Sequence, residues 1–152
     1  MIGRHHVEKR LAQLRIALRR QGLKATRQRA EILRELASTG EHPDAETIHG
    51  RVRRRIPAIS LDTVYRTLRM FEERGVIARV VALGDRARFD ADTGRHHHFV
   101  CVRCGRVADL PSGVFDSFRL PPEVVAADSL DGARIEVRGV CARCGPRRRG
   151  TA

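Results

Sequence analysis

Apolar side chains recur every three or four residues in four segments of the first half of the chain, which is the spacing of amphipathic helices. The first pattern runs through Leu11, Leu14 and Leu18 and stops at Gly22, a residue type that often ends a helix. Each of the other three patterns begins at a residue that can cap a helix N-terminus. Those caps are Thr26, Asp44 and Ser60, and the patterns occupy residues 26–40, 44–56 and 60–75. The first half is therefore predicted to be mostly helical.

The last of these predicted helices has two contrasting faces, and a β-rich stretch at residues 76–83 follows it. Its apolar face consists of Leu61, Val64, Leu68 and Phe71. Its opposite face consists of Asp62, Thr63, Arg66 and Arg69, with Tyr65 at the edge. Short helices followed by a pair of strands are typical of a winged helix-turn-helix, and such a polar face can contact phosphates and base edges of DNA. An ordinary helical bundle with a solvated polar face is the alternative.

The second half has shorter patterns. Residues 84–94 show no clear period, and we interpret them as a hinge loop. Beyond them, β-like runs at 97–102 and 133–140 flank a mixed segment, 115–125, that can hold one helix. We therefore predict an α+β protein. Its predicted parts are a winged-helix DNA-binding domain, the hinge loop and a small α/β domain, at residues 1–83, 84–94 and 95–152.

The charge of the chain is uneven along its length of 152 residues. Residues 1–83 hold 18 Lys and Arg against 9 Asp and Glu, a net of +9, whereas residues 84–152 hold 12 against 9, a net of +3 that includes the tail Arg147, Arg148 and Arg149. A basic half either aids solubility or binds a polyanion, which is usually nucleic acid. We find no apolar run long enough to span a membrane and no apolar core of a secretion signal. We therefore expect a cytoplasmic protein without a membrane partner.

Residues 100–105 and 140–145 repeat one pattern, Val-Cys-x-Arg-Cys-Gly. Two residues between the cysteines let both thiolates reach one ion, and the glycine permits the tight turn that follows. Four thiolates form a closed tetrahedral zinc site, which is structural because no coordination position stays open. The predicted zinc ligands are Cys101, Cys104, Cys141 and Cys144. A redox pair or unrelated thiols are the alternatives, but repetition of the whole hexapeptide favours zinc.

Three consecutive histidines precede the first cysteine pair. On an extended strand His96 and His98 share one face and Cys101 takes the other, so one strand can supply ligands to two metal sites. Three aspartates are close enough in sequence to add oxygen ligands: Asp90, Asp92 and Asp109. Two imidazoles with carboxylates suit iron or manganese, although zinc also binds such sets. A solvent-exposed polar strand is the alternative.

Two other classes of protein fit the sequence less well. A thiol oxidoreductase or a hydrolase would need a nucleophile, a base and an orienting group at recognisable spacing, and we find no such set, so we do not expect an enzyme. A purely structural zinc adaptor would leave the basic half and the helix with Tyr65 and Arg66 unexplained.

Three segments, in this order, resemble the signature segments of the ferric uptake regulator (Fur) family. They are residues 60–68, the His-x-His-x-x-Cys-x-x-Cys-Gly run at 96–105, and the Cys-x-x-Cys at 141–144. The resemblance extends over nearly the whole chain. It implies a homodimer, joined through a dimerisation and metal-binding domain at 95–152, that represses transcription from double-stranded operator DNA when a regulatory metal is bound. The DNA contacts that it implies are Lys24, Ser60, Thr63, Tyr65 and Arg66.

Within the family, the ligand positions resemble those of the peroxide-sensing (PerR-like) branch. The implied ligands for Fe²⁺ or Mn²⁺ are His42, Asp90, His96, His98 and Asp109, with Asp92 a weaker candidate. Residues 91–95 lack the cysteine that zinc-sensing relatives usually supply. Ala133 stands where iron-sensing relatives often place a histidine of a further site. An iron- or manganese-responsive repressor without peroxide sensing is the alternative function.

The implied ligands also suggest a switch. His42 precedes a helix of the first half, whereas the other four ligands lie at or beyond the hinge, so one ion held by all five would join the two domains. Resemblance to the peroxide-sensing branch implies that, with iron bound, peroxide converts His42 or His96 into 2-oxo-histidine and DNA is released. Manganese in the same place is expected to leave both histidines intact.

Overall fold

The computed structural model describes residues 4–81, 87–94, 96–115, 117, 119, 121 and 135–145. The chain divides into two compact units, Met1–Thr93 and Gly94–Ala152. The arginine tail at 147–149, Ala133 and most of the mixed segment at 115–125 lie outside the described residues. Among the described helices, none has the length and apolar character needed to cross a membrane.

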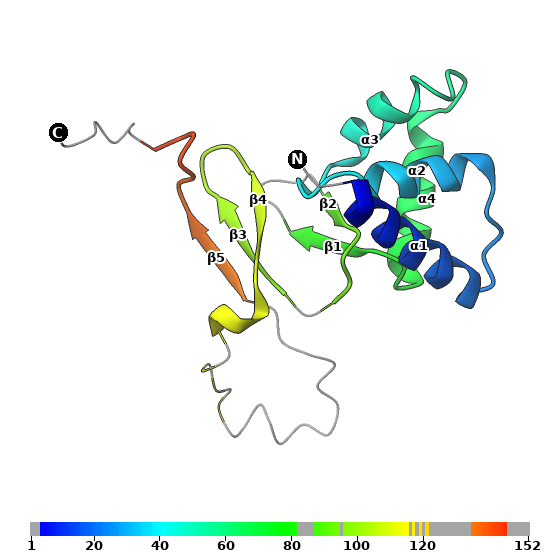
Figure 1. Ribbon diagram of the computed structural model, residues 1–152. Coiled ribbons are helices and arrows are strands. Elements are labelled where there is room, and N and C mark those ends of the chain that lie inside the picture. The colour runs from blue at the N-terminus through cyan, green and yellow to red at the C-terminus, as the bar shows by residue number, and fades with distance from the viewer. Residues whose placement is uncertain are drawn as a thin grey trace. The chain divides into compact units, whose positions relative to one another are not determined.

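The described part of the first unit contains the four predicted helices (Figure 1). They are α1 (Arg4–Arg20), α2 (Arg27–Ala37), α3 (Ala45–Val52) and α4 (Leu61–Glu73). Thr26, Asp44 and Ser60 each accept a hydrogen bond from the backbone N–H three residues further on, so the predicted caps are confirmed. Gly22 and Gly75, with φ of 67° and 64°, follow α1 and α4 in a left-handed conformation that glycine adopts without strain.

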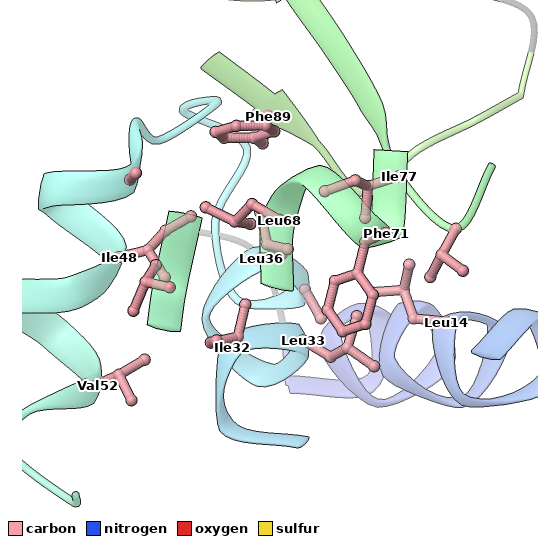
Figure 2. Packing of buried hydrophobic residues seen from close by; sticks show 14 of the residues in the cluster. Leu14, Ile32, Leu33, Leu36, Ile48, Val52, Leu68, Phe71, Ile77 and Phe89 are labelled. Atoms are coloured by element: carbon pink, nitrogen blue, oxygen red, sulfur yellow. The ribbon is translucent and has the colours of Figure 1, made fainter. Parts of the chain in front are cut away.

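The apolar faces of the helices pack into one core, in which Figure 2 shows side chains from α1, α2, α3 and α4. Val64, Leu68 and Phe71 of α4 have no exposed surface. Burying side chains of this size stabilises the fold by about 1.5–3 kcal/mol each. Because this face of α4 is fixed in the core, the residues on its other face, Tyr65 and Arg66 among them, are exposed to solvent.

Strands β1 (Ala78–Val81) and β2 (Ala87–Asp90) form an antiparallel pair, with Ala78 opposite Asp90 and Val81 opposite Ala87. Strand β2 lies within residues 84–94, where we expected a hinge loop, so for these four residues the structure differs from that expectation. Ala87, Arg88, Phe89 and Asp90 do alternate apolar and polar side chains, but a run of only four residues beside Gly84 and Gly94 is a weak signal. Burial of the Phe89 side chain at the edge of the helical core holds this strand in place (Figure 2).

The second unit contains a three-stranded sheet with the order β4-β3-β5. Its strands are β3 (His97–Cys101), β4 (Val107–Leu110) and β5 (Glu136–Gly139), and a 3₁₀ turn, η1 (Ser112–Phe115), follows β4. Strand β3 is antiparallel to β4 and parallel to β5. Strands predicted at 97–102 and within 133–140 are thus confirmed, as is the mixed helix and sheet architecture.

Candidate metal centres and nucleic-acid interface

The four cysteines of the repeated pattern come together in the second unit. Their sulfur atoms all lie within 4.8 Å of one another. Strands β3 and β5 run in parallel with Cys101 opposite Gly139, so each cysteine pair begins at the same end of the sheet. The two turns share one hydrogen bond, because the backbone N–H of Gly105 donates to the Cys101 carbonyl at 2.9 Å and that of Gly145 to the Cys141 carbonyl at 2.8 Å.

The spacing and protonation of these thiols fit a zinc ion. Sulfurs about 2.3 Å from a tetrahedral zinc lie about 3.8 Å apart, and the distance between Cys104 Sγ and Cys141 Sγ is 3.7 Å. The backbone N–H of Cys141 donates to Cys101 Sγ and lowers the pKa of that thiol to about 6. Hydrogen bonding to Cys104 raises the pKa of Cys144 instead. The cluster therefore holds at least one thiolate at neutral pH in the absence of a metal.

A second donor set in the same unit comes from strands β3 and β4 and from His96, which directly precedes β3. The Nε2 atoms of His96 and His98 are 2.9 Å apart, and Asp109 Oδ1 is 3.8 Å from the former and 3.7 Å from the latter. Asp109 reaches this position because it pairs with His98 across the antiparallel ladder. Ring nitrogens about 2.1 Å from one ion, at right angles to each other, lie about 3.0 Å apart. The three side chains thus have the spacing of a partial metal site.

His97 takes no part in this set because its side chain lies on the other face of β3. Its Nδ1 accepts a hydrogen bond from the backbone N–H of Ile135 at 3.1 Å, and its ring packs edge-on against Phe115. The ring of His96 is oriented by a contact of 2.9 Å between its Nδ1 and the Gly94 carbonyl. This contact leaves the Nε2 atom of His96 facing His98.

A third donor pair lies in the first unit. His42 Nε2 is 3.3 Å from Asp90 Oδ2, and both side chains are only 2% exposed. His42 lies just before α3 and Asp90 ends β2, and the two segments are joined where Phe89 donates to the Pro43 carbonyl at 3.1 Å. The backbone of His42 has a φ of 51°, which is uncommon for a residue other than glycine. The fold therefore holds an imidazole against a carboxylate in a strained, buried turn.

Two further groups contact this carboxylate. The backbone N–H of Asp92 donates to Asp90 Oδ1 at 2.8 Å, while the side chain of Asp92 is exposed. Arg10 Nη2 of α1 lies 3.7 Å from the same oxygen. Arg10 could not be identified from the sequence, because it lies 80 positions from Asp90 on a helix that carries many other polar residues.

The exposed face of α4 carries the residues that we expected to contact DNA. Ser60 Oγ caps the helix and lies 2.8 Å from Thr63 Oγ1. The side chain of Arg66 is 82% exposed. Tyr65 is 44% exposed, and its hydroxyl donates to Glu46 Oε1 of α3 at 2.8 Å. These side chains are accessible to a macromolecule, and the Tyr65 ring is held in place by α3.

Lys24 precedes α2 in the same unit and is exposed. Its carbonyl accepts a hydrogen bond from Arg29 Nη1 at 2.9 Å. Arg29 also lines a groove together with Thr63 and Arg66 of α4. The sequence did not single out Arg29, since it follows the helical period and only the packing of α2 beside α4 gives it this position.

Comparison with known proteins gives one consistent result. The model of the ferric uptake regulator family matches residues 20–116. The peroxide-responsive repressor PerR of Staphylococcus epidermidis is 32% identical over 140 residues, which cover 92% of this chain and 91% of that protein. PerR of Staphylococcus aureus strain USA300 is 31% identical, with 92% of each chain covered.

Solved structures agree in fold. The Campylobacter jejuni peroxide stress regulator is 27% identical with a TM-score of 0.68, over 84% of this chain and 96% of that chain. The ferric uptake regulator of Pseudomonas aeruginosa with manganese is 31% identical with a TM-score of 0.67, over 82% of this chain and 94% of that chain.

Proposed function

The chain belongs to the ferric uptake regulator family, and we propose that it is a metal-dependent, peroxide-responsive repressor that binds double-stranded operator DNA as a homodimer. The relatives named PerR match it over nearly its whole length. The observation that carries the proposal is the presence of two nitrogen and oxygen donor sets, apart from the cysteines, one in each unit. Since the proposed target is DNA, the cytoplasm stays the expected location.

We assign the four cysteines to a structural Zn²⁺ ion. Cys101 and Cys141 are buried at the ends of β3 and β5, and Cys104 and Cys144 follow in the two similar turns. With all four positions filled by sulfur, the ion would have no place for a substrate. Its role would be to join the two strand ends and to stabilise the folded unit, because metal binding free energy adds to folding free energy.

We assign the regulatory metal to the two remaining donor sets taken together. His42 and Asp90 offer one nitrogen and one oxygen, while His96, His98 and Asp109 offer two nitrogens and one oxygen. Neither set alone fills the coordination of a divalent ion, whereas five nitrogen and oxygen ligands without a thiolate suit Fe²⁺ or Mn²⁺. Asp92 is left out of this assignment because its side chain is exposed, while its backbone N–H donates to Asp90 Oδ1.

This assignment couples the metal to DNA binding. His42 and Asp90 belong to the unit that carries α4, and the other three ligands belong to the unit that carries the cysteines. A conformation in which both donor sets hold the same ion is favoured by the difference in metal affinity between it and the other conformations. We propose that this conformation is the one that binds DNA. The exposed face of α4 would then contact the major groove through Tyr65, Arg66, Thr63 and Ser60. Lys24 would contact the minor groove.

Peroxide sensing would act on the histidine ligands. Fe²⁺ held by these ligands would catalyse the oxidation of a ligand ring by peroxide. One peroxide oxygen would be added to a ring carbon of His42 or His96, giving 2-oxo-histidine, and the other would leave as water. A ring altered in this way no longer serves as the same ligand, so the two donor sets separate and repression ends.

The decisive experiment is peptide mass spectrometry of the iron-loaded and manganese-loaded protein before and after low peroxide. We expect a mass gain of one oxygen on the peptide that contains His42 or His96 with iron, no gain with manganese, and parallel loss of DNA binding with iron alone. Oxidation confined to the four cysteines, or no oxidation while DNA binding is lost, would contradict the proposed mechanism.

An iron- or manganese-responsive repressor without peroxide sensing is the second candidate. It is favoured by the manganese-containing Pseudomonas aeruginosa regulator, whose TM-score and identity are similar to those of the peroxide stress regulator. The same experiment separates the two candidates. Metal-dependent DNA binding that survives peroxide in the iron-loaded protein would support the second.

A further inference from the structure

A cluster of arginines lies at the end of α3, before the helix that carries Tyr65 and Arg66. The cluster consists of Arg51, Arg53, Arg54 and Arg55. Two of the four charges are compensated, since Arg51 pairs with Glu41 at 3.4 Å and Arg55 pairs with Glu31 and Glu35. Arg53 and Arg54 are exposed, and no ion pair in the described part of the chain involves either of them. The turn therefore presents two uncompensated guanidinium groups to solvent.

The turn that carries these two arginines is fixed to the rest of the first unit. Arg55 Nε lies 2.5 Å from Glu31 Oε2 of α2, and its guanidinium also bonds Glu35, a residue that is only 8% exposed. Arg27 Nη2 of α2 donates to the Arg55 carbonyl at 3.3 Å. Arg53 and Arg54 are thus held on a turn that packs against α2 and do not extend from a free loop.

The same contacts show on which surface the turn lies. Arg27, which bonds the turn, is the first residue of α2, and its neighbours Thr26 and Gln28 line a groove of about 420 Å³. Thr63 and Arg66 of α4 line the same groove. The turn that carries Arg53 and Arg54 is therefore joined, through Arg27, to the start of α2, next to residues that line a groove shared with α4. In Figure 1 the α3–α4 connection and the start of α4 lie beside one another within this unit.

We propose that Arg53 and Arg54 form a second DNA-contacting surface, which binds phosphates of the duplex that flanks the bases met by α4. This inference rests on the proposed DNA binding and adds residues outside the set of Lys24, Ser60, Thr63, Tyr65 and Arg66. Guanidinium groups donate bidentate hydrogen bonds to phosphate oxygens but read no base from there. The surface adds affinity that depends on salt and is independent of base sequence.

The test uses the full-length, zinc- and manganese-loaded protein and the double variant Arg53→Gln with Arg54→Gln. The matched control is Arg19→Gln with Arg20→Gln, which removes the same charge from the last turn of α1. Arg20 lines a different groove with Arg74, at the end of α4 that is far from Ser60. Both pairs are exposed and lie at a helix C-terminus, so both changes are expected to cost similar, small amounts of stability.

Binding is measured against salt on two duplexes, one selected by the wild type from a random pool and one of scrambled sequence. Each lost phosphate contact lowers the slope of log affinity against log salt by about 0.9, so two contacts per chain lower it by about 1.8. The proposed homodimer would lose four such contacts, so its slope would fall by about 3.6, and raising salt from 50 to 200 mM would weaken the variant about 150-fold less than the wild type. We expect this change on both duplexes for the Arg53 and Arg54 variant and no change for the control.

The results test the proposed phosphate-binding surface separately from the proposed repressor function. Equal slopes for the two double variants would overturn the proposed surface, as would a loss confined to the selected duplex. If the wild type shows no preference for any sequence but the Arg53 and Arg54 variant still lowers the slope on scrambled DNA, the repressor proposal fails while the phosphate surface stands. A wild type that binds neither duplex at 50 mM salt contradicts both.

Discussion

His42 has a left-handed backbone and a buried imidazole, although most residues other than glycine avoid this conformation. Such a conformation costs of the order of 1–3 kcal/mol and persists only where its surroundings impose it. Here the imposing contacts are the hydrogen bond from Phe89 to the Pro43 carbonyl and that from Arg88 to the His42 carbonyl. The strain is consistent with a side chain that is kept for metal binding.

Replacing His42 by glycine and by alanine separates the strain from the ligand. Both variants lose the imidazole, but only alanine is strained in the left-handed backbone conformation. The His42→Gly variant should therefore be more stable than His42→Ala by up to about 1 kcal/mol. The measurement is urea unfolding of zinc-loaded protein without a regulatory metal. Greater stability of His42→Ala would mean that the turn relaxes once the histidine is gone. Manganese binding should be lost in both variants.

Arg10 places a positive charge beside one of the proposed metal ligands. Its guanidinium lies 3.7 Å from Asp90 Oδ1 and is bonded to the Thr39 carbonyl at 3.3 Å. A divalent ion on Asp90 would be repelled by this charge, so Arg10→Gln should tighten manganese binding by about fivefold, the equivalent of about 1 kcal/mol for one partly exposed charge interaction. Isothermal titration calorimetry measures this, with Arg10→Lys as the control that keeps the charge. Weaker binding in Arg10→Gln would instead make Arg10 a residue that orients Asp90.

At the scale of elements, the helices could be predicted because their signals are local. A cap, an apolar period and a terminal glycine all lie within one helix, as for Ser60, Leu68 and Gly75 around α4. Strand β2 has only a weak local signal, four alternating residues, and its formation depends on pairing with β1 and on burial of Phe89. Tertiary contacts therefore decide this strand, and a single sequence does not contain them.

The metal-donor residues likewise differ in whether a local sequence pattern identifies them. The period of two along β3 was enough to predict that His96 and His98 share a face and that His97 does not. That Asp109 lies opposite His98 depends on the register of β3 against β4, which the spacing of the two residues does not fix. His42 came from family resemblance alone, since no pattern links it to Asp90, 48 positions away.

The ends of β3 and β5 give a prediction for the zinc site. Cys101→Ser or Cys141→Ser leaves three thiolates, so we expect loss of zinc, measured by mass spectrometry under native conditions, together with loss of the dimer. Wild-type protein that stays a stable dimer after zinc is removed by a chelator would contradict this. Surface changes such as Arg19→Gln with Arg20→Gln serve as the control.

The same site has a defined dependence on pH. Zinc must displace the protons of the thiols that it binds, so its affinity falls as pH is lowered. The pKa of Cys101 is lowered to about 6, so this thiol has already lost its proton at pH 7.5. The pKa of Cys144 is raised, so this thiol is still protonated and loses its proton only when zinc binds. We therefore expect fewer than four protons released per zinc at pH 7.5, rising as pH is lowered towards 6. Calorimetry in buffers of different ionisation enthalpy measures the number, and a constant release of four would show that Cys101 is not preferentially ionised.

At the scale of the whole molecule, the proposed switch requires ligands from both units. Asp90 belongs to the unit that carries α4, while Asp109 belongs to the unit that carries the cysteines and no residue that we expect at DNA. If one ion holds both carboxylates in the DNA-binding conformation, losing either has the same consequence, although only one lies in the unit that carries α4.

Asp90→Ala and Asp109→Ala should therefore both abolish the manganese dependence of DNA binding and leave zinc content unchanged. Fluorescence anisotropy of a labelled operator duplex, with and without manganese, measures this, and we expect at least a tenfold loss of metal-dependent affinity in each, a coupling of about 1.4 kcal/mol. Asp92→Ala is the matched control, because its side chain is exposed and its backbone N–H, which the substitution keeps, is what supports Asp90. Greater damage from Asp92→Ala than from Asp90→Ala would mean that the ligand has been assigned two positions too early. A normal metal response in Asp109→Ala would mean that the unit with α4 senses the metal by itself, and that no ion joins the two halves of the chain.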